Sequence, residues 1–322
     1  MRTDLADAQG LTPVTAHTSA ANDRRVVPKP RPRPDRGRWL GVAFVAPQVL
    51  GVIILGVVPF LFVIWYSFNE WRPLTGEREF TGLDNYSRLF ADPTFSASVV
   101  ASLLFSVGVL VLNLVIAISL AVLLNRRMRG ITAFRTIFFS PVVVSVVAWS
   151  VTWGFLLAPD GGINGALQLL GIDGTSWLAD SSTALLSLVV VQVFKGVGMN
   201  MVLFLAALQS VPEEIREAAQ LDGASPWRSF WSITVPMIAP TILLTGILTT
   251  IGSLEVFAPV QLLTDGGPGN ATNVLPFFLY RTAFVSQQFG YASAIGVVLF
   301  AIILALTMLQ WTTRRKWVHD EV

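Results

Sequence analysis

The sequence contains no cysteine, which excludes disulfide bonds and thiol chemistry. Its two histidines, His17 and His319, lie in polar terminal segments, far from any metal-ligand spacing, so no metal site is expected. Neither a G-x-x-x-x-G-K-[ST] phosphate loop nor a G-x-S-x-G nucleophile motif occurs. We therefore expect no catalytic residue and no cofactor bound by this chain.

Charge is also scarce, because only 13% of the residues are charged and 53% are hydrophobic. Together with a mean hydropathy of +0.63, this composition is typical of a membrane protein. About 20 helical residues cross a hydrocarbon core, and six apolar runs reach that length. The runs cover residues 41–66, 99–124, 137–157, 183–208, 239–263 and 291–311. The expected fold class is an all-α integral membrane protein with six transmembrane helices.

The basic residues predict the orientation of these helices. Seventeen of them fall in the segments on one side of the six runs, and four fall on the other side. Because cytoplasmic segments carry the excess of lysine and arginine, both termini are expected to be cytoplasmic. The expected domains are a disordered basic, proline-rich tail (1–38), a permease domain (39–312) and a C-terminal tail (313–322). The Arg24–Arg38 stretch adjoins the first run, which favours contact with anionic lipid over nucleic acid.

A polar segment, residues 210–240, separates the fourth and fifth apolar runs. Ser210 and Glu213 have the spacing of a capping box, which predicts the start of a short helix. Asp222-Gly223 would end that helix, and Ser225 would cap a second one with Pro226 at its first position. Two short helices joined at a glycine on the cytoplasmic side suit a groove in a soluble partner.

The same segment resembles the EAA loop of the membrane subunits of ABC importers. In that family the loop docks into a cleft of the ATPase subunit and transmits its closure to the transmembrane helices. The resemblance implies the type I ABC importer permease fold, a cytoplasmic coupling loop at 210–240, and ATP and Mg bound by the partner ATPase. The residues that match, and that are therefore the expected ATPase-coupling residues, are Glu217, Ala218, Ala219, Asp222, Gly223, Ala224, Ile233 and Pro236.

Other stretches between residues 40 and 312 resemble the carbohydrate-uptake branch of these importers, the maltose and glycerol-3-phosphate type. They include Phe194–Gly198, Leu205–Pro212, the glycine-rich Thr264–Thr272 turn and Gly290–Ala294. The resemblance implies half of a translocation pathway for a sugar in a bacterial plasma membrane. It also implies a second homologous permease, two ATPase subunits and an extracytoplasmic binding protein.

A sugar pathway needs amide, hydroxyl and aromatic groups at membrane depth. The bulky or costly polar residues within the runs are the candidates, namely Trp149, Trp153, Gln192, Lys195, Asn200 and Glu255. The tryptophans are also compatible with a role as interface anchors. Lys195 and Glu255 are expected at similar depths, so we predict an ion pair between them that either joins two helices or lines the pathway. The alternative is that each has a separate partner on another helix or subunit.

Two other functions are compatible with the sequence. One is an ABC importer permease for another solute class, such as a peptide or polyamine. The other is a gradient-driven secondary transporter, which needs ligands for a coupling ion and leaves the EAA-like segment without a role.

Overall fold

The computed structural model describes residues 36–72, 76–125 and 129–313, and these residues are mostly helical. The chain divides into two units, residues 1–53 and 54–322. In the first unit the structure describes α1 (Arg36–Val52), after which a π-helical turn, Ile53–Val57, leads into α2. The predicted terminal tails fall almost entirely outside the described residues.

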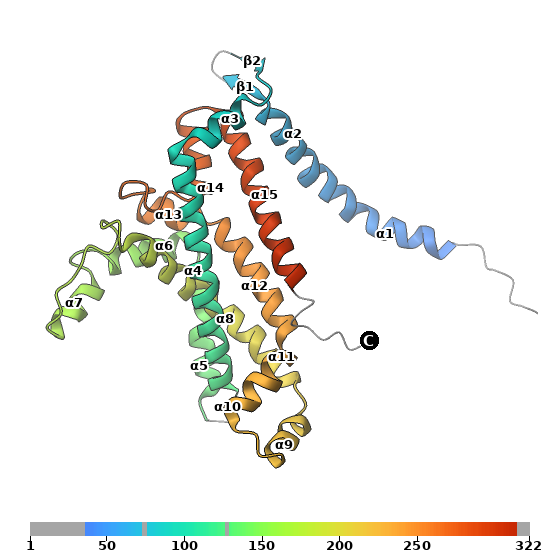
Figure 1. Ribbon diagram of the computed structural model, residues 1–322, viewed down its shortest axis with the longest axis vertical. Coiled ribbons are helices and arrows are strands. Elements are labelled where there is room, and N and C mark those ends of the chain that lie inside the picture. Colours follow the sequence, from blue (N-terminus) through green and yellow to red (C-terminus); the bar gives the residue numbers. More distant parts are fainter. Residues whose placement is uncertain (1–35, 73–75, 126–128, 314–322) are drawn as a thin grey trace, which may run out of the picture. The chain divides into compact units, whose positions relative to one another are not determined.

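The second unit holds a two-stranded hairpin and the remaining helices (Figure 1). In chain order the elements up to the long helix α8 are α2 (Val58–Ser67), β1 (Asn69–Arg72), β2 (Glu77–Phe80), α3 (Asp84–Ala91), α4 (Pro93–Leu124), α5 (Ile131–Phe139), a 3-10 turn η2 (Ser140–Val143), α6 (Val146–Leu156), α7 (Gly162–Leu169) and α8 (Ala184–Ser210). They are followed by α9 (Glu213–Leu221), α10 (Pro226–Ser229), a π-helical turn (Phe230–Thr234), α11 (Val235–Met237), α12 (Ala239–Leu254), α13 (Ala258–Leu263), α14 (Leu275–Tyr280), a second such turn (Arg281–Val285) and α15 (Phe289–Thr313).

Four helical stretches are long and apolar enough to cross a membrane, and they correspond to the first, second, fourth and sixth predicted runs. They are Val42–Ser67, Pro93–Leu124, Ala184–Ser210 and Phe289–Thr313. Two further stretches pass the same test only as bent pairs: Ile131–Val143 with Val146–Leu156, bent by 105°, and Pro226–Met237 with Ala239–Leu254, bent by 68°. The described chain therefore has up to six spans if each bent pair counts as one.

Two predicted runs are wrong as continuous helices. The run 137–157 is interrupted because Val144 adopts an extended backbone, with ψ at 134°, after the 3-10 turn that begins beside Pro141. The run 239–263 ends at Leu254, and Phe257 has non-helical backbone angles before α13 begins. A proline within the first two positions of η2 and of α13 cannot donate a backbone hydrogen bond, which weakens helix continuity at both places.

The long helix α4 begins where Asp92 accepts a hydrogen bond from the Thr94 N–H at 2.8 Å, with Pro93 in the first turn. It packs mainly against α8, and also against α12. Its buried residues recur every three or four positions and are mostly small, which lets the helices approach closely: Phe95, Ser98, Ala101, Ser102, Phe105, Ser106, Val109, Asn113, Ala117, Ala121 and Leu124. Val100, Leu104 and Val111 are exposed, as expected of a surface that meets lipid.

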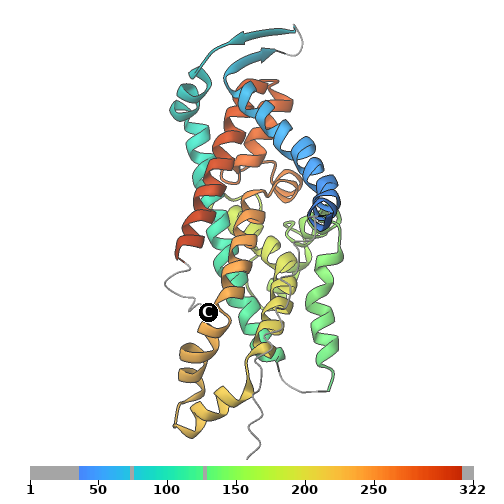
Figure 2. The same cartoon turned by 90° about the vertical axis from the view of Figure 1, so that its right-hand side faces the viewer.

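The hairpin is an addition to the all-helical prediction, and Asn85 fixes it to the helices. Strand β1 pairs antiparallel with β2, with Asn69 opposite Phe80. The buried Asn85 amide donates to the carbonyls of Ser67 (3.0 Å) and Asn69 (3.2 Å). Gly290 is required beside them, because a Cβ there would lie 1.9 Å from the Asn69 carbonyl oxygen. Within residues 54–322 the hairpin and α3 lie at one end of the helices, and α9 and α10 lie at the other (Figures 1 and 2).

Candidate functional site

The segment 210–240 forms two short helices that meet at a glycine. Helix α9 ends at Leu221, and Gly223 follows with a positive φ of 80°, a conformation that glycine adopts without strain. The Ala224 N–H donates to the Ala219 carbonyl at 2.9 Å and closes the turn. This geometry confirms the predicted break at Asp222-Gly223.

The two predicted helix caps differ in outcome. Ser225 is the N-cap of α10, since its hydroxyl accepts from the Arg228 N–H at 3.3 Å, as predicted. The capping box at Ser210 is wrong. Ser210 is the last residue of α8, its hydroxyl donates to the Ala207 carbonyl at 2.7 Å, and Pro212 occupies the N-cap position of α9. The apolar helix α8 extends further than the capping signal indicates.

Part of the surface of this segment is apolar, although the segment also exposes charged residues such as Glu217 and Asp222. Leu221 is 89% exposed and Trp227 is 72% exposed. Trp227, Phe230 and Trp231 form a cluster with ring centroids 5.4 to 6.4 Å apart. Exposed apolar clusters of this kind mark interaction surfaces.

The eight EAA-like residues are distributed over this surface. Ala219 is buried and supports the turn, whereas Glu217, Ala218, Asp222, Gly223 and Pro236 are exposed, and Ala224 and Ile233 are half-buried. The segment continues through Val235–Met237 into α12 across the 68° bend. The exposed residues are thus available to a partner, and the same backbone leads directly into a long helix.

Three pathway candidates lie together beside the bend between η2 and α6. The Trp149 indole N–H donates to the Val191 carbonyl at 3.1 Å, and its ring lies 5.8 Å from that of Trp153. Trp153 in turn lies 5.6 Å from the ring of Phe194. The Lys195 ammonium lies 5.7 Å from the Trp149 ring centroid. Gln192 is half-buried on the same helix, α8.

Asn200 lies in a different environment. Its amide donates to the Asn113 side-chain oxygen at 2.6 Å and to the Thr249 hydroxyl at 3.0 Å, which joins α8 to α4 and α12. Two more polar contacts hold α12: Ser106 with Ser253 at 2.7 Å, and the Gln310 amide to the Thr250 hydroxyl at 2.8 Å. Asn200 therefore belongs to a set of interhelical hydrogen bonds around α12.

The predicted ion pair between Lys195 and Glu255 is wrong. The Lys195 ammonium donates to the backbone carbonyls of Val144 at 2.6 Å and Pro141 at 3.2 Å. Glu255 is exposed at the C-terminal end of α12. Equal depth along two helices does not bring side chains together when the helices face different neighbours, and a nearby helix end offered the ammonium closer acceptors.

The glycine-rich turn Thr264–Thr272 is internally braced. The Thr272 hydroxyl contacts the Thr264 hydroxyl at 2.8 Å and the Gly267 carbonyl at 2.7 Å. Gly266 has a φ of 80°, and a Cβ there would lie 2.6 Å from the Phe277 ring. Just beyond the turn, the Asn273 amide donates to the Ser98 hydroxyl of α4 at 3.0 Å. The turn is a fixed feature at the end of α13.

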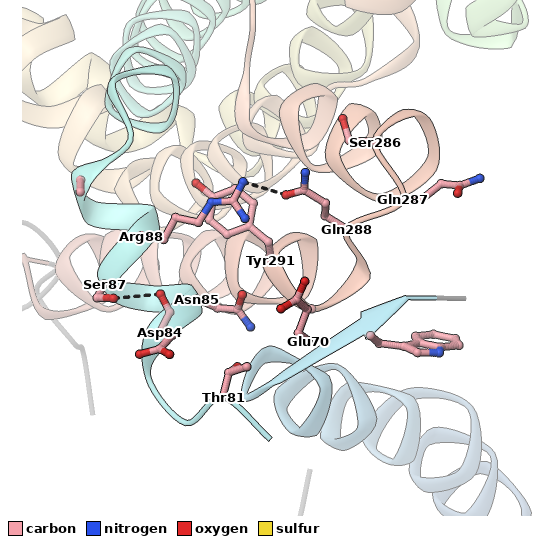
Figure 3. A pocket seen from close by; sticks show the side chains of 13 residues that line it. Glu70, Thr81, Asp84, Asn85, Ser87, Arg88, Ser286, Gln287, Gln288 and Tyr291 are labelled. Carbon is pink, nitrogen blue, oxygen red and sulfur yellow. Dashed lines mark hydrogen bonds between the residues drawn. The ribbon is translucent and has the colours of Figure 1, made fainter. Parts of the chain in front are cut away.

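A pocket of about 870 Å³ lies between β1, α3 and the start of α15 (Figure 3). Arg88 stacks on the Tyr291 ring at 4.4 Å and donates to the Gln288 side-chain oxygen at 2.9 Å. Trp71 also lines the pocket, and the Arg78 guanidinium of the hairpin lies 5.0 Å from its ring. Trp71 and Tyr291 each line the pocket with a guanidinium group against the ring, and Glu70, Asp84 and Arg88 add charged groups to this partly apolar lining.

The sequence did not identify three residues that make contacts between distant parts of the chain, namely Asp92, Tyr291 and Thr249. Asp92 and Tyr291 are joined by a 2.8 Å hydrogen bond across 199 residues, and Thr249 completes the Asn200 contacts. Tyr291 follows Gly290 within a stretch that resembles the importer family, and this was the available signal.

The geometry defines a class: a helical membrane protein with two short exposed helices, α9 and α10, beyond the end of a long apolar helix. A family model described as the binding-protein-dependent transport system inner membrane component matches residues 113–317. The chain belongs to this family, and it is therefore a transporter permease and not an enzyme. Membership of this family excludes the alternative of a gradient-driven secondary transporter.

Similar proteins agree with this assignment. The chain is 35% identical over 272 residues to the probable ABC transporter permease protein YurN of Bacillus subtilis, covering 83% of this chain and 93% of YurN. It is 34% identical over 281 residues to the multiple sugar-binding transport system permease protein MsmF of Streptococcus mutans, covering 87% and 96%. The fold is similar to a chain of a bacterial alginate ABC transporter, with a TM-score of 0.76, 24% identity and coverage of 88% and 96%.

Proposed function

We propose that this chain forms half of the translocation pathway of an ATP-driven importer for a sugar or sugar derivative, in a bacterial plasma (inner) membrane. The observation that carries the proposal is the extensive similarity to MsmF, which is named for the transport of multiple sugars. The similar alginate transporter also handles a carbohydrate, although that likeness bears on the fold alone.

The proposed complex contains a second homologous permease, two ATPase subunits and an extracytoplasmic binding protein. ATP and Mg bind to the ATPases, and this chain binds no cofactor. The ATPase docks on the segment 210–240, which is supported by the exposed Leu221 and Trp227 beside the glycine turn. Glu217 is proposed to meet a basic group of the ATPase.

The proposed topology counts each bent pair as one span. An even number of spans puts both termini on one side, and the excess of basic residues assigns that side to the cytoplasm, next to anionic lipid. The hairpin and the pocket beside α3 would then face outward. Their charged surface, at the opposite end from α9 and α10, supports this end as the face for the binding protein.

In the proposed cycle, closure of the ATPase dimer moves α9 and α10, and the motion enters α12 through the 68° bend. The polar contacts of α12 with α4, α8 and α15 would make these helices move together. Sugar released from the binding protein would pass Trp149, Trp153, Gln192 and Glu255, and ATP hydrolysis would reset the pathway.

The test is uptake into proteoliposomes that hold the full complex and ATP, with the cognate binding protein outside. The solutes are radiolabelled maltotriose, lactose and diacetylchitobiose, with a dipeptide and spermidine as controls for the other solute classes. We expect vanadate-sensitive uptake of at least one sugar and of neither control. Uptake of only the dipeptide or spermidine would overturn the sugar assignment, and uptake unaffected by ATP or vanadate would overturn the ATP-driven mechanism.

A further inference from the structure

Lys195 is a charged residue in the middle of α8, a helix apolar enough to span a membrane. Its ammonium donates to the carbonyls of Val144 at 2.6 Å and Pro141 at 3.2 Å. Val144 lies at the break between the two arms of the bent pair, Ile131–Val143 and Val146–Leu156, and Pro141 lies in the last turn of the first arm. The lysine therefore bonds to the backbone of another span at the point where that span is interrupted.

The Pro141 carbonyl already accepts from the Val144 N–H at 3.3 Å, so the Val144 carbonyl is the acceptor that needs such a donor. The last carbonyls of a helix have no N–H partner within the helix, and lipid offers none. Val144 is extended, so its carbonyl is turned away from the helical path of either arm. A cation at this position also interacts favourably with the negative, C-terminal end of the helix dipole of Ile131–Val143.

Two further contacts hold the arms of the bend against α8. Gly198, one turn after Lys195, allows the first arm to approach so closely that a Cβ would lie 2.0 Å from the Phe138 carbonyl oxygen. The second arm is held by Trp149, whose indole donates to the Val191 carbonyl at 3.1 Å. The break itself, between these two contacts, is held by Lys195.

We propose that Lys195 is a positioning residue that caps the broken span, fixes its 105° bend and thereby places Trp149 and Trp153 for transport. This inference rests on the proposed function only where it assigns the two tryptophans to the pathway. Two of the three ammonium N–H groups are engaged with backbone, so the main contacts of Lys195 are with the bend and not with the solute.

The bend is measured directly by the distance between two spin labels. Ile137 and Phe155 lie on opposite arms and are 63% and 74% exposed, so each is replaced by cysteine in this cysteine-free chain. At 1.5 Å per residue and a 105° bend, the two helix-axis positions are about 17 Å apart, and they would be about 27 Å apart in a straight helix. The complex in nanodiscs is compared with Lys195→Met and with the charge-retaining control Lys195→Arg.

We expect the distance in Lys195→Met to lengthen by several ångströms or to broaden over that range, and Lys195→Arg to keep the parental distance. An unchanged, narrow distance in Lys195→Met would overturn the proposal. If Lys195→Met does not accumulate, Lys195→Gln is measured instead, because its neutral side chain is one bond shorter and cannot hold both carbonyls as the ammonium does. An intermediate distance is then expected, and a parental one would contradict the capping role.

Uptake kinetics separate positioning from solute binding. For a positioning role, maximal uptake rate in Lys195→Met falls at least tenfold together with the change in distance, and Lys195→Arg recovers most of it. A raised KM with the parental distance and rate would make Lys195 a solute ligand and overturn the inference. The distance measurement requires no transported solute, so failure of the sugar assignment leaves it interpretable.

Discussion

Gly198 gives the most direct prediction about packing within the bundle. A Cβ at this position would lie 2.0 Å from the Phe138 carbonyl oxygen, 2.7 Å from its carbon and 2.9 Å from the Phe139 Cα. All three atoms are backbone, so no side chain can rotate away, and α5 must move by about 1 Å or more to relieve the contact. Gly198→Ala should therefore destabilise the fold.

The expected cost of such overpacking is about 1 to 3 kcal/mol, which is about 5- to 150-fold in the ratio of folded to unfolded protein. The assay is the midpoint temperature for loss of the monodisperse peak of the solubilised complex on size exclusion. The midpoint should fall by several degrees in Gly198→Ala.

Gly252→Ala is the matched control, because Gly252 is helical and a Cβ there meets nothing within 4 Å. Replacing this glycine should leave the midpoint unchanged or raise it slightly, since alanine has the higher helix propensity. Equal midpoints for Gly198→Ala, Gly252→Ala and the parent would refute the close approach of α8 and α5.

Other predictions concern the two ends of the molecule. Asn85→Ala leaves the Ser67 and Asn69 carbonyls without their donor and should cost about 1 to 3 kcal/mol, seen as a lower thermal midpoint; an unchanged midpoint would contradict the role of Asn85. Burial of Asp92 opposes its ionisation, but hydrogen bonds from the Tyr291 hydroxyl and the Thr94 N–H outweigh it and lower the pKa of Asp92 below its ordinary value. The resulting stabilisation is present above the ordinary pKa and is lost as pH falls through the lowered one, so a pH scan of the midpoint should show a loss on acidification that Asp92→Asn lacks. For topology, an impermeant maleimide should label Ser181→Cys in intact cells and Gln220→Cys only after permeabilisation, and the reverse pattern would contradict the orientation.

The sequence predicted the long apolar helices well, because hydrophobicity over 18 or more residues is a local property. It did not predict the 105° bend, since the donor that caps the break, Lys195, lies 51 residues beyond Val144. The hairpin was also missed, because its attachment depends on Asn85 bonding to carbonyls 16 and 18 residues away. Side-chain partners of this kind are set by tertiary packing.

In the candidate site, too, the features set by local sequence were predicted better than those set by tertiary packing. The helix break at Gly223 and the cap at Ser225 follow from local chemistry, and the structure has both. The capping box at Ser210 failed because α8 continues through that residue. The coupling roles of the EAA-like residues and the pathway roles of Trp149 and Gln192 stay predictions, because each needs a partner or a solute to be tested.

The central claim is that the segment 210–240 couples this permease to an ATPase, and Gly223→Asp tests it most directly. Gly223 and Gly130 have φ of 80° and 85°, and a Cβ added to either glycine would have no atom within 4 Å. Gly130→Asp therefore imposes the same backbone strain and the same charge on a different turn. The measurement is the ATPase activity of the purified complex in response to the loaded binding protein. We predict that Gly223→Asp loses ATPase association and stimulation, whereas Gly130→Asp keeps both. A normal complex with full stimulation in Gly223→Asp would contradict the coupling role of this segment.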